Sequence, residues 1–324
     1  MNETLQLEYA AAIAGAGVVR LRDWSTVRAG GGDRASFLHN MCTNDVRRLT
    51  PGDGCEAFFT DVKGKIHSHG ILLAGDDAIQ IVAMPGTAER LMPQLDRYII
   101  REDVKLADES ANLAWLLVFG ERARKIAVAA LGEGAVAGLD AAWSHRNVAV
   151  AGAAATVVRC DLPWTGGFLL GCSPAALDAL EGQWTGAGGT LGGEELWQTI
   201  RVESAWPLWG VDFDASNLPQ EVSRDAQAIS FRKGCYLGQE TVARLDALGH
   251  VNKQLVAVAF AEEDVPPAGT ELLHNDQAAG RVTSSCWSPR AAKPQAICMV
   301  KRGAAAVGST LHWSGGAGSV VAGS

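Results

Sequence analysis

The chain has 324 residues, a length that predicts two or three domains, and its 48% hydrophobic and 20% charged residues are typical of a folded globular protein. A formal net charge of −8 argues against direct binding of nucleic acid, which needs a basic surface to neutralise phosphates. The seven cysteines are scattered without a C-x-x-C pair, so neither a disulfide framework nor a metal site is expected from them.

The N-terminal segment carries Glu3 and Glu8 where a secretory signal would be basic. No apolar run approaches the roughly 18 residues that a membrane span requires. We therefore expect a cytoplasmic monomer with reduced thiols and no membrane partner.

The first predicted elements are a strand over residues 18–21, a second short strand, a glycine-rich turn and a helix with Asp33 as its N-cap. Phe37, Leu38 and Met41 fall on one face of that helix. This spacing predicts an amphipathic helix packed on a sheet, so these side chains are core residues.

A β-hairpin is predicted next, with strands over 57–60 and 66–73 joined by a turn at 61–65. His67 and His69 alternate with apolar residues on the second strand and share one face. Two histidines on one face resemble metal ligands, but no third ligand stands nearby in the sequence. A solvated face is the favoured interpretation, and no metal site is expected.

Short strands and single helices then alternate along the chain. Strands are predicted around 79–83, 113–119 and 149–158, helices over 86–98 and 194–203, and a loop over the Gly-, Thr- and Ala-rich residues 182–193. This mixture predicts an α+β fold rather than a regular parallel βαβ series.

The pattern changes to strands alone after residue 250. Four strands are predicted over 255–260, 280–284, 296–301 and 310–313, separated by turn signals. We therefore predict a larger region over residues 1–250 and a small β-barrel or sandwich over 251–324.

Residues 201–250 combine carboxylates with aromatic and glycine-rich turns. A carboxylate in such a setting can accept two parallel hydrogen bonds from a flat heterocycle, which makes Glu203 and Glu221 candidate ligand-binding residues. An alternative of equal weight is that Glu203 pairs with Arg201 or caps a turn, and the residues alone leave it open.

Cys235 follows Lys233 and precedes a helix that is expected to begin near Gly238 and to end near Leu248. A lysine and a helix N-terminus create positive potential, which lowers the pKa of a thiol and raises its thiolate fraction. The alternative is a buried structural cysteine, but the residues favour a reactive thiol.

Two motifs carry a resemblance to known proteins. The octapeptide Lys233-Gly234-Cys235-Tyr236-Leu237-Gly238-Gln239-Glu240 matches the K-G-C-Y/F-x-G-Q-E signature of the YgfZ-type folate-binding proteins. Arg201-x-Glu203, with Pro207, Gly210 and Asp212, resembles the R-x-E-x-G-x-P-x-x-G element of the wider glycine-cleavage T-protein family. Weaker matches at residues 33–46, 64–65 and 279–289 extend the resemblance over most of the chain.

The resemblance implies two interlaced α+β folate-binding domains and a C-terminal β-barrel, arranged as a cloverleaf around a channel for tetrahydrofolate or a one-carbon derivative. It implies that Glu203 faces the pterin and that Cys235 lies at the channel mouth. Lys233 is expected to act with Cys235, and the remaining cofactor-binding candidates are Arg201, Glu221, Tyr236, Gln239 and Glu240. Ser204 departs from the family's glycine after the glutamate.

The implied function is an accessory role in the assembly or repair of iron-sulfur proteins, with folate and iron-sulfur client or assembly proteins as partners. The first alternative is an aminomethyltransferase, but residues 82–86 lack the acid that T-proteins carry after this strand, and Cys235 stands where they have an acid. The second alternative is a pure binding or scaffold module whose barrel contacts a protein client. Its basic residues could attract an acidic partner or a polyglutamyl tail, although scattered surface charge is the favoured interpretation of Arg224, Arg232, Lys233, Lys301 and Arg302.

Overall fold

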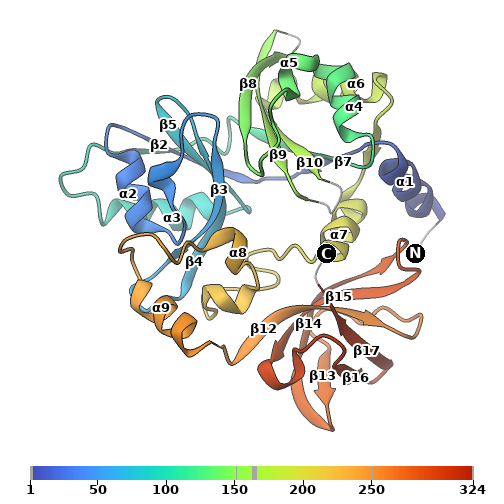
Figure 1. Cartoon of the computed structure of the whole chain (residues 1–324). Coiled ribbons are helices and arrows are strands. Elements are labelled where there is room, and N and C mark those ends of the chain that lie inside the picture. The colour runs from blue at the N-terminus through green and yellow to red at the C-terminus, as the bar shows by residue number, and fades with distance from the viewer. Residues whose placement is uncertain (1–2, 151, 163–165, 250, 323–324) are drawn as a thin grey trace.

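Three bodies of structure surround a common centre in the computed structural model, which describes residues 3–150, 152–162, 166–249 and 251–322 (Figure 1). Over these residues the strands form two sheets and one closed barrel. No described helix is both long and apolar enough to cross a membrane.

The chain contributes its first strand to the six-stranded sheet, called the second sheet below. It then forms the five-stranded first sheet, and afterwards returns to complete the second. Helix α1 (Glu3–Ala14) leads into β1 (Gly17–Leu21), which lies between β11 and β7 of the second sheet. The very next strand, β2 (Ser25–Gly30), belongs to the first sheet. The two α+β domains are therefore interlaced, as the resemblance predicted.

The first sheet has the strand order β3-β4-β5-β2-β6, and its neighbours are antiparallel. Its other strands are β3 (Gly54–Thr60), β4 (Ile66–Ala74), β5 (Ala78–Ala83) and β6 (Lys105–Asp108), and its helices are α2 (Arg34–Met41), η1 (Val46–Arg48) and α3 (Thr87–Asp96). The predicted hairpin is confirmed as β3 and β4. The predicted core face of α2 is also confirmed, since Phe37, Leu38 and Met41 are buried.

The second sheet has the order β11-β1-β7-β10-β9-β8. It contains β7 (Ala114–Phe119), β8 (His145–Val150), β9 (Ala153–Cys160), β10 (Gly167–Cys172) and β11 (Thr190–Gly192), with α4 (Ala123–Leu131), α5 (Glu133–Val136), η2 (Pro174–Ala176) and α6 (Leu177–Gly186). Helix α7 (Glu194–Glu203) then runs from this sheet toward the barrel (Figure 1).

The prediction of a loop over residues 182–193 is wrong. Residues 182–186 continue α6, and β11 pairs in parallel with β1. Burial outweighs the low helix propensity of the glycines here, because Trp184 in α6 is only 1% exposed and anchors the helix on the sheet.

Residues 204–252, here called the connecting segment, join α7 to the barrel. Three short helices lie in the described part of this segment. These are η3 (Pro219–Val222), α8 (Asp225–Ala228) and α9 (Gln239–Leu248). Helix α8 contacts β3 of the first sheet, and η3 contacts both α9 and the barrel strand β12. The segment therefore joins the first domain to the barrel.

The C-terminal barrel closes in the order β12-β15-β14-β13-β16-β17, which confirms the predicted β-barrel. Its strands are β12 (Lys253–Phe260), β13 (Glu271–His274), β14 (Gln277–Ser288), β15 (Lys293–Lys301), β16 (Thr310–Trp313) and β17 (Gly316–Val321), with η4 (Arg302–Ala304) between them.

The core between the two sheets is rich in indole rings. Trp24, Trp115, Trp143, Trp197 and Trp206 all belong to one buried cluster. Trp24 packs edge-on against Trp197 at a centroid distance of 6.4 Å, and Trp143 packs edge-on against Trp206 at 5.9 Å. Large side chains therefore occupy the region where the two domains meet.

Candidate functional site

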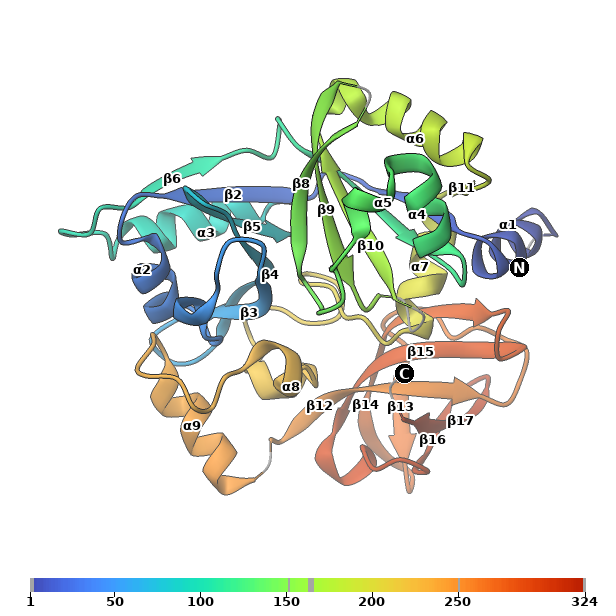
Figure 2. The same cartoon turned by 45° about the horizontal axis from the view of Figure 1, so that its top comes forward.

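The octapeptide 233–240 lies against the first domain and leads directly into α9 (Figure 2). The backbone N–H of Leu237 donates to the Asn40 carbonyl at 2.9 Å, and Thr60 Oγ1 donates to the Leu237 carbonyl at 2.5 Å. Gly238 has a φ of +81°, and a Cβ there would lie 2.4 Å from the Asp61 carbonyl oxygen. Only glycine fits this position, so the loop is held tightly against the turn of the β3–β4 hairpin.

Lys233 is the buried anchor of this loop. Its ammonium donates to the carbonyls of His39, Cys42 and Asn44, with distances of 2.7 Å and 2.9 Å for the last two. An ammonium has three hydrogens, so this set uses its full donor capacity and leaves none for Cys235. Desolvation lowers the pKa of Lys233. Its place at the C-terminal end of α2 suits the negative end of the helix dipole.

Cys235 differs from the other thiols in its exposure to solvent. Of the seven cysteines, all within the described ranges, it alone is exposed. Burial raises the pKa of each of the other six, to about 12 for Cys160. The fold therefore presents one thiol to solvent and keeps the rest protonated and shielded.

Arg201 joins α7 to the barrel. Its side chain is 2% exposed and donates to Asp212 Oδ2 at 2.9 Å, to Ser284 Oγ at 2.6 Å and to Gln198 Oε1 at 2.6 Å. Asp212 also accepts hydrogen bonds from Ser284 Oγ and Thr283 Oγ1, both on β14. Arg201 thus pairs with Asp212, which answers the alternative that it pairs with Glu203.

Glu203 is a buried carboxylate at the junction of α1, α7 and β14. Tyr9 donates its phenolic hydroxyl to Glu203 Oε2 at 2.7 Å, and Ser288 Oγ donates to Oε1. Burial raises the pKa of Glu203. Figure 2 shows α7 between the second sheet and the barrel, whereas α9 lies under the first sheet. The helix that ends at Glu203 and the helix that follows the octapeptide are therefore on different sides of the centre.

The other predicted residues have mostly local contacts. Glu221 Oε2 accepts hydrogen bonds from Asn217 Nδ2 at 2.8 Å and from the Leu218 N–H at 3.1 Å, which caps η3. Tyr236 is buried in an apolar cluster beside the ammonium of Lys233. In the first turn of α9, Gln239 is half-buried and Glu240 is exposed.

A buried charged cluster went unnoticed in the sequence, and it overturns the interpretation of His69 as part of a solvated face. His69 is buried, and its Nε2 lies 2.8 Å from Glu56 Oε1. Arg224 donates its Nε to the same oxygen at 2.8 Å, and its guanidinium stacks over the Trp206 ring at 4.3 Å. Burial opposes ionisation of Glu56, but Arg224 and then His69 outweigh it and lower the pKa of Glu56 to about 2.

Two family models match this chain, one over the α+β region and one over the barrel. Residues 1–231 match the family described as the GCVT N-terminal domain, and residues 253–320 match the glycine cleavage T-protein C-terminal barrel domain. The chain belongs to the glycine-cleavage T-protein superfamily.

Within this superfamily, several of the similar proteins are YgfZ proteins. The tRNA-modifying protein YgfZ of Sodalis glossinidius is 26% identical over 275 residues, covering 83% of this chain and 80% of that protein. YgfZ of Photorhabdus laumondii is 28% identical over 258 residues, covering 79% and 74%. An Arabidopsis thaliana protein described as a "Putative transferase", chloroplastic, is 25% identical over 310 residues, covering 91% of this chain and 67% of that protein. The predicted family is confirmed.

A solved T-protein shares the fold. The glycine cleavage system aminomethyltransferase T from Bartonella henselae superposes with a TM-score of 0.85 and 18% identity, covering 98% of this chain and 88% of that one. At this identity the likeness speaks to architecture alone, and it confirms the predicted α+β cloverleaf with its barrel.

A small cavity lies near the centre of this YgfZ-type protein. Trp24, His69, Met84 and Trp206 are among the residues that line a cavity of about 10 Å³ between the first sheet and residues 206–208. Small-molecule pockets are typically about 300–1,000 Å³. No carboxylate lines the cavity within the described part of the chain.

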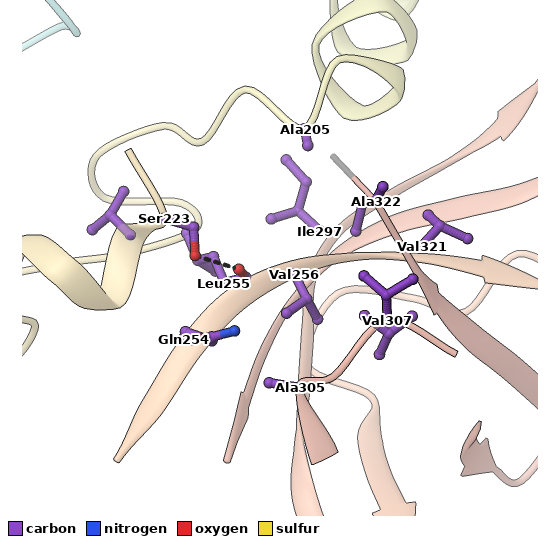
Figure 3. A pocket seen from close by; sticks show the side chains of 13 residues that line it. Ala205, Ser223, Gln254, Leu255, Val256, Ile297, Ala305, Val307, Val321 and Ala322 are labelled. Atoms are coloured by element: carbon purple, nitrogen blue, oxygen red, sulfur yellow. Dashed lines mark hydrogen bonds between the residues drawn. The ribbon is translucent and has the colours of Figure 1, made fainter. Parts of the chain in front are cut away.

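A larger hollow of about 260 Å³ lies where the barrel faces the connecting segment (Figure 3). Its lining is mostly aliphatic, with Val256, Val307 and Val321 prominent, and Ser223 Oγ donates to the Leu255 carbonyl at 2.7 Å. No titratable side chain is among its described lining residues, so this hollow offers no acid-base or nucleophilic chemistry.

Proposed function

We propose that this YgfZ-type protein binds tetrahydrofolate and assists the assembly or repair of iron-sulfur proteins, with Cys235 as its functional thiol. The observation that carries the proposal is the selective exposure of Cys235 on a loop that buried contacts hold in place. A thiol in this setting can bind a client's metal or sulfur atom, or be reversibly oxidised, without local unfolding.

The role of Lys233 in this proposal is to position the loop. Its ammonium connects the octapeptide to the end of α2, so the exposed Cys235 is displayed from a fixed backbone. Leu237 and Gly238 fix the other side of the loop on the hairpin. The thiolate chemistry itself then depends on solvent access and on the client.

The residues around Glu203 are chemically suited to a pterin. A buried carboxylate can accept a pair of N–H donors, and Tyr9, Ser288 and the Arg290 backbone hold Glu203 in one orientation. Glu203 borders the tryptophan cluster through Tyr9. Bound tetrahydrofolate would supply a one-carbon carrier. A folate bound in the cavity of about 10 Å³ beside Trp24 and Trp206 would have to displace these side chains.

Aminomethyl transfer is the alternative function, and the lining of the central cavity disfavours it. Proton transfer to or from an amine needs a positioned acid or base, and no carboxylate is among the described residues that line this cavity. His69 is the titratable residue among them, and its Nε2 already lies 2.8 Å from Glu56 Oε1. Turnover of an aminomethyl-lipoyl carrier by the purified protein would favour this alternative over the proposal.

The similar YgfZ proteins are named for tRNA modification, and we propose that any such link here runs through a protein client. Direct RNA binding draws on phosphate neutralisation, and this chain carries a net charge of −8. Filter binding of unmodified tRNA at moderate salt should therefore show no affinity above the nonspecific level.

The thiol is tested by complementation in a strain that lacks the protein. Cys235→Ala should fail to restore the activity of iron-sulfur enzymes, whereas Cys55→Ala, which removes a half-buried thiol, should restore it. Full restoration by Cys235→Ala would remove the thiol from the mechanism.

Folate binding is tested separately by calorimetry with tetrahydrofolate. Glu203→Gln should weaken binding by at least about tenfold, because the neutral amide no longer offers a charged acceptor. Glu195→Gln, at an exposed position in the same helix, should bind like the wild type. If the wild type binds no reduced folate, a scaffold role becomes the better account.

A further inference from the structure

Tyr9 makes the contacts that the proposed function assigns to a pterin. Its side chain is 5% exposed, and its ring belongs to the buried cluster that contains five tryptophans. Its hydroxyl donates to Glu203 Oε2 at 2.7 Å. A flat heterocycle with N–H donors needs the same two contacts, an apolar setting for the ring and a carboxylate for the polar edge. Tyr9 and such a heterocycle therefore compete for one carboxylate.

The hydrogen-bonding capacity of Glu203 is largely used in this structure. An ionised carboxylate has about four lone-pair sites. Tyr9, the Ser288 hydroxyl and the Arg290 backbone N–H occupy at least three of them. A heterocycle that donates two parallel N–H bonds needs two sites. At least one of these donors must therefore leave before both bonds can form.

Two of the three donors are built into the barrel. Ser288 is 0% exposed, pairs with Lys293 across the β14–β15 hairpin and accepts from the Ala291 N–H at 3.0 Å. Arg290 lies in the turn between these two strands. Withdrawal of either donor would disturb the hairpin, so both are expected to stay in place.

Tyr9 lies on a helix with few attachments. Helix α1 contacts β1, β11 and α7, and its buried residues form a single stripe of Leu5, Tyr9 and Ala12. Among the described residues, no ion pair joins Glu3 or Glu8 to the rest of the chain. Both views place α1 at the outer edge of the molecule (Figure 1, Figure 2). Tyr9 is therefore the donor that can leave with the least rearrangement.

We propose that Tyr9 is a displaceable plug of the folate site, an inference that rests on the proposed role of Glu203 in folate binding. In the free protein α1 holds the Tyr9 hydroxyl on Glu203, and a reduced folate binds when its pterin N–H donors take the place of that hydroxyl. The measured affinity is then lower than the affinity of the open site, in proportion to the fraction of molecules in which Tyr9 has withdrawn. Tyr9 thereby sets the folate concentration to which the protein responds.

A different role for Tyr9 makes the opposite predictions. If Tyr9 is a fixed wall that orients Glu203 for the pterin, loss of its hydroxyl weakens folate binding, and bound folate holds α1 more firmly. If Tyr9 is the plug, loss of its hydroxyl strengthens folate binding, and bound folate loosens α1.

The first test is calorimetry with tetrahydrofolate on the full-length protein. Tyr9→Phe keeps the ring and removes the hydroxyl that holds the plug on Glu203, so it should bind at least about fivefold more tightly than the wild type. Leu5→Ala loosens α1 but keeps the Tyr9 hydroxyl, and it should shift the affinity in the same direction. Tyr98→Phe removes an exposed phenol and is the matched control, which should bind like the wild type.

The second test is hydrogen exchange of the wild type with and without saturating tetrahydrofolate, which needs no variant. Bound ligand should speed the exchange of the α1 amides. Unchanged or slower α1 exchange, or a Tyr9→Phe variant that binds no more tightly than the wild type, would overturn the plug while folate binding itself stands. If neither the wild type nor the variants bind tetrahydrofolate, the proposed folate function fails and the plug fails with it. Binding by Tyr9→Phe and Leu5→Ala without binding by the wild type would support the plug.

Discussion

The thiols of this protein differ in their accessibility to solvent. A reagent must reach the sulfur atom before the thiolate fraction can affect the rate of reaction. Limiting iodoacetamide should alkylate native protein at Cys235 alone, as read by peptide mass spectrometry. Cys235→Ser should stay unmodified over the same time and should change the free energy of unfolding by less than about 0.5 kcal/mol, as expected for a surface position. Unfolded wild type, with all seven thiols modified, is the control, and equally fast labelling of native Cys55 or Cys286 would contradict the prediction.

Lys233 is expected to matter for stability rather than for proton transfer. Lys233→Met leaves the carbonyls of His39, Cys42 and Asn44 without their shared donor, which should lower the free energy of unfolding by about 2–4 kcal/mol. Urea unfolding measures this directly. Lys63→Met, which removes an exposed lysine from the neighbouring turn, should cost less than about 0.5 kcal/mol. Equal stability of the two variants would show that the buried ammonium contributes little.

The sequence identified Cys235 as unusual but could not show where the Lys233 side chain points. Proximity along the chain suggested an ammonium beside a thiolate, whereas the carbonyl oxygens that receive it belong to residues about 190 positions earlier. Local motifs report which residue types are adjacent in sequence. The partners of a buried charge depend on the packing of remote segments.

At the scale of elements, the octapeptide depends on one close backbone approach. Gly238→Ala forces a left-handed residue and places a Cβ 2.4 Å from the Asp61 carbonyl, so it should cost about 2 kcal/mol or more and should loosen the start of α9. Gly234→Ala is the matched control within the same octapeptide, since nothing lies within 4 Å of its added Cβ. Urea unfolding and hydrogen exchange in α9 measure both effects, and equal behaviour of the two variants would show that the hairpin does not constrain the loop.

Elements with strong local patterns could be predicted, and those held by distant packing could not. The β3–β4 hairpin, the helix after Gly238 and the barrel strands follow from alternation and turn residues. Residues 182–193 were misassigned because their glycines resemble a loop, while the evidence for structure was the burial of Trp184 and the pairing of β11 with a strand more than 170 residues earlier.

At the scale of the whole molecule, the sequence predicted the family and the interlaced domains, but not the contacts that join them. Glu56 and Arg224 are separated by 168 positions, and Arg201 and Ser284 by 83. Each pair joins separate bodies of structure, the first linking β3 to the connecting segment and the second linking α7 to the barrel. Such contacts carry no periodic signal, so only the folded chain reveals them.

The buried Glu56–Arg224 pair should make the stability of the whole molecule sensitive to acid. The pKa of Glu56 is about 2 in the folded protein and about 4.5 when unfolded, so its contribution is complete above about pH 4.5 and is lost as pH falls toward 2. Between pH 7 and pH 3 this should remove about 2 kcal/mol from the free energy of unfolding. Glu56→Gln should be less stable than wild type at pH 7 by about 3–5 kcal/mol, because it leaves the Arg224 charge unpaired.

The decisive measurement is how the difference in free energy of unfolding between the wild type and Glu56→Gln changes with pH. Urea unfolding from pH 3 to pH 7 should show that the deficit of Glu56→Gln shrinks as pH falls, since wild type loses a contribution that the variant lacks. Glu263→Gln, which removes an exposed carboxylate from the barrel, should keep the full acid sensitivity of the wild type. A constant deficit across this range would mean that Glu56 does not titrate with the depressed pKa, and that the cluster of Glu56, His69 and Arg224 is joined by packing rather than by charge.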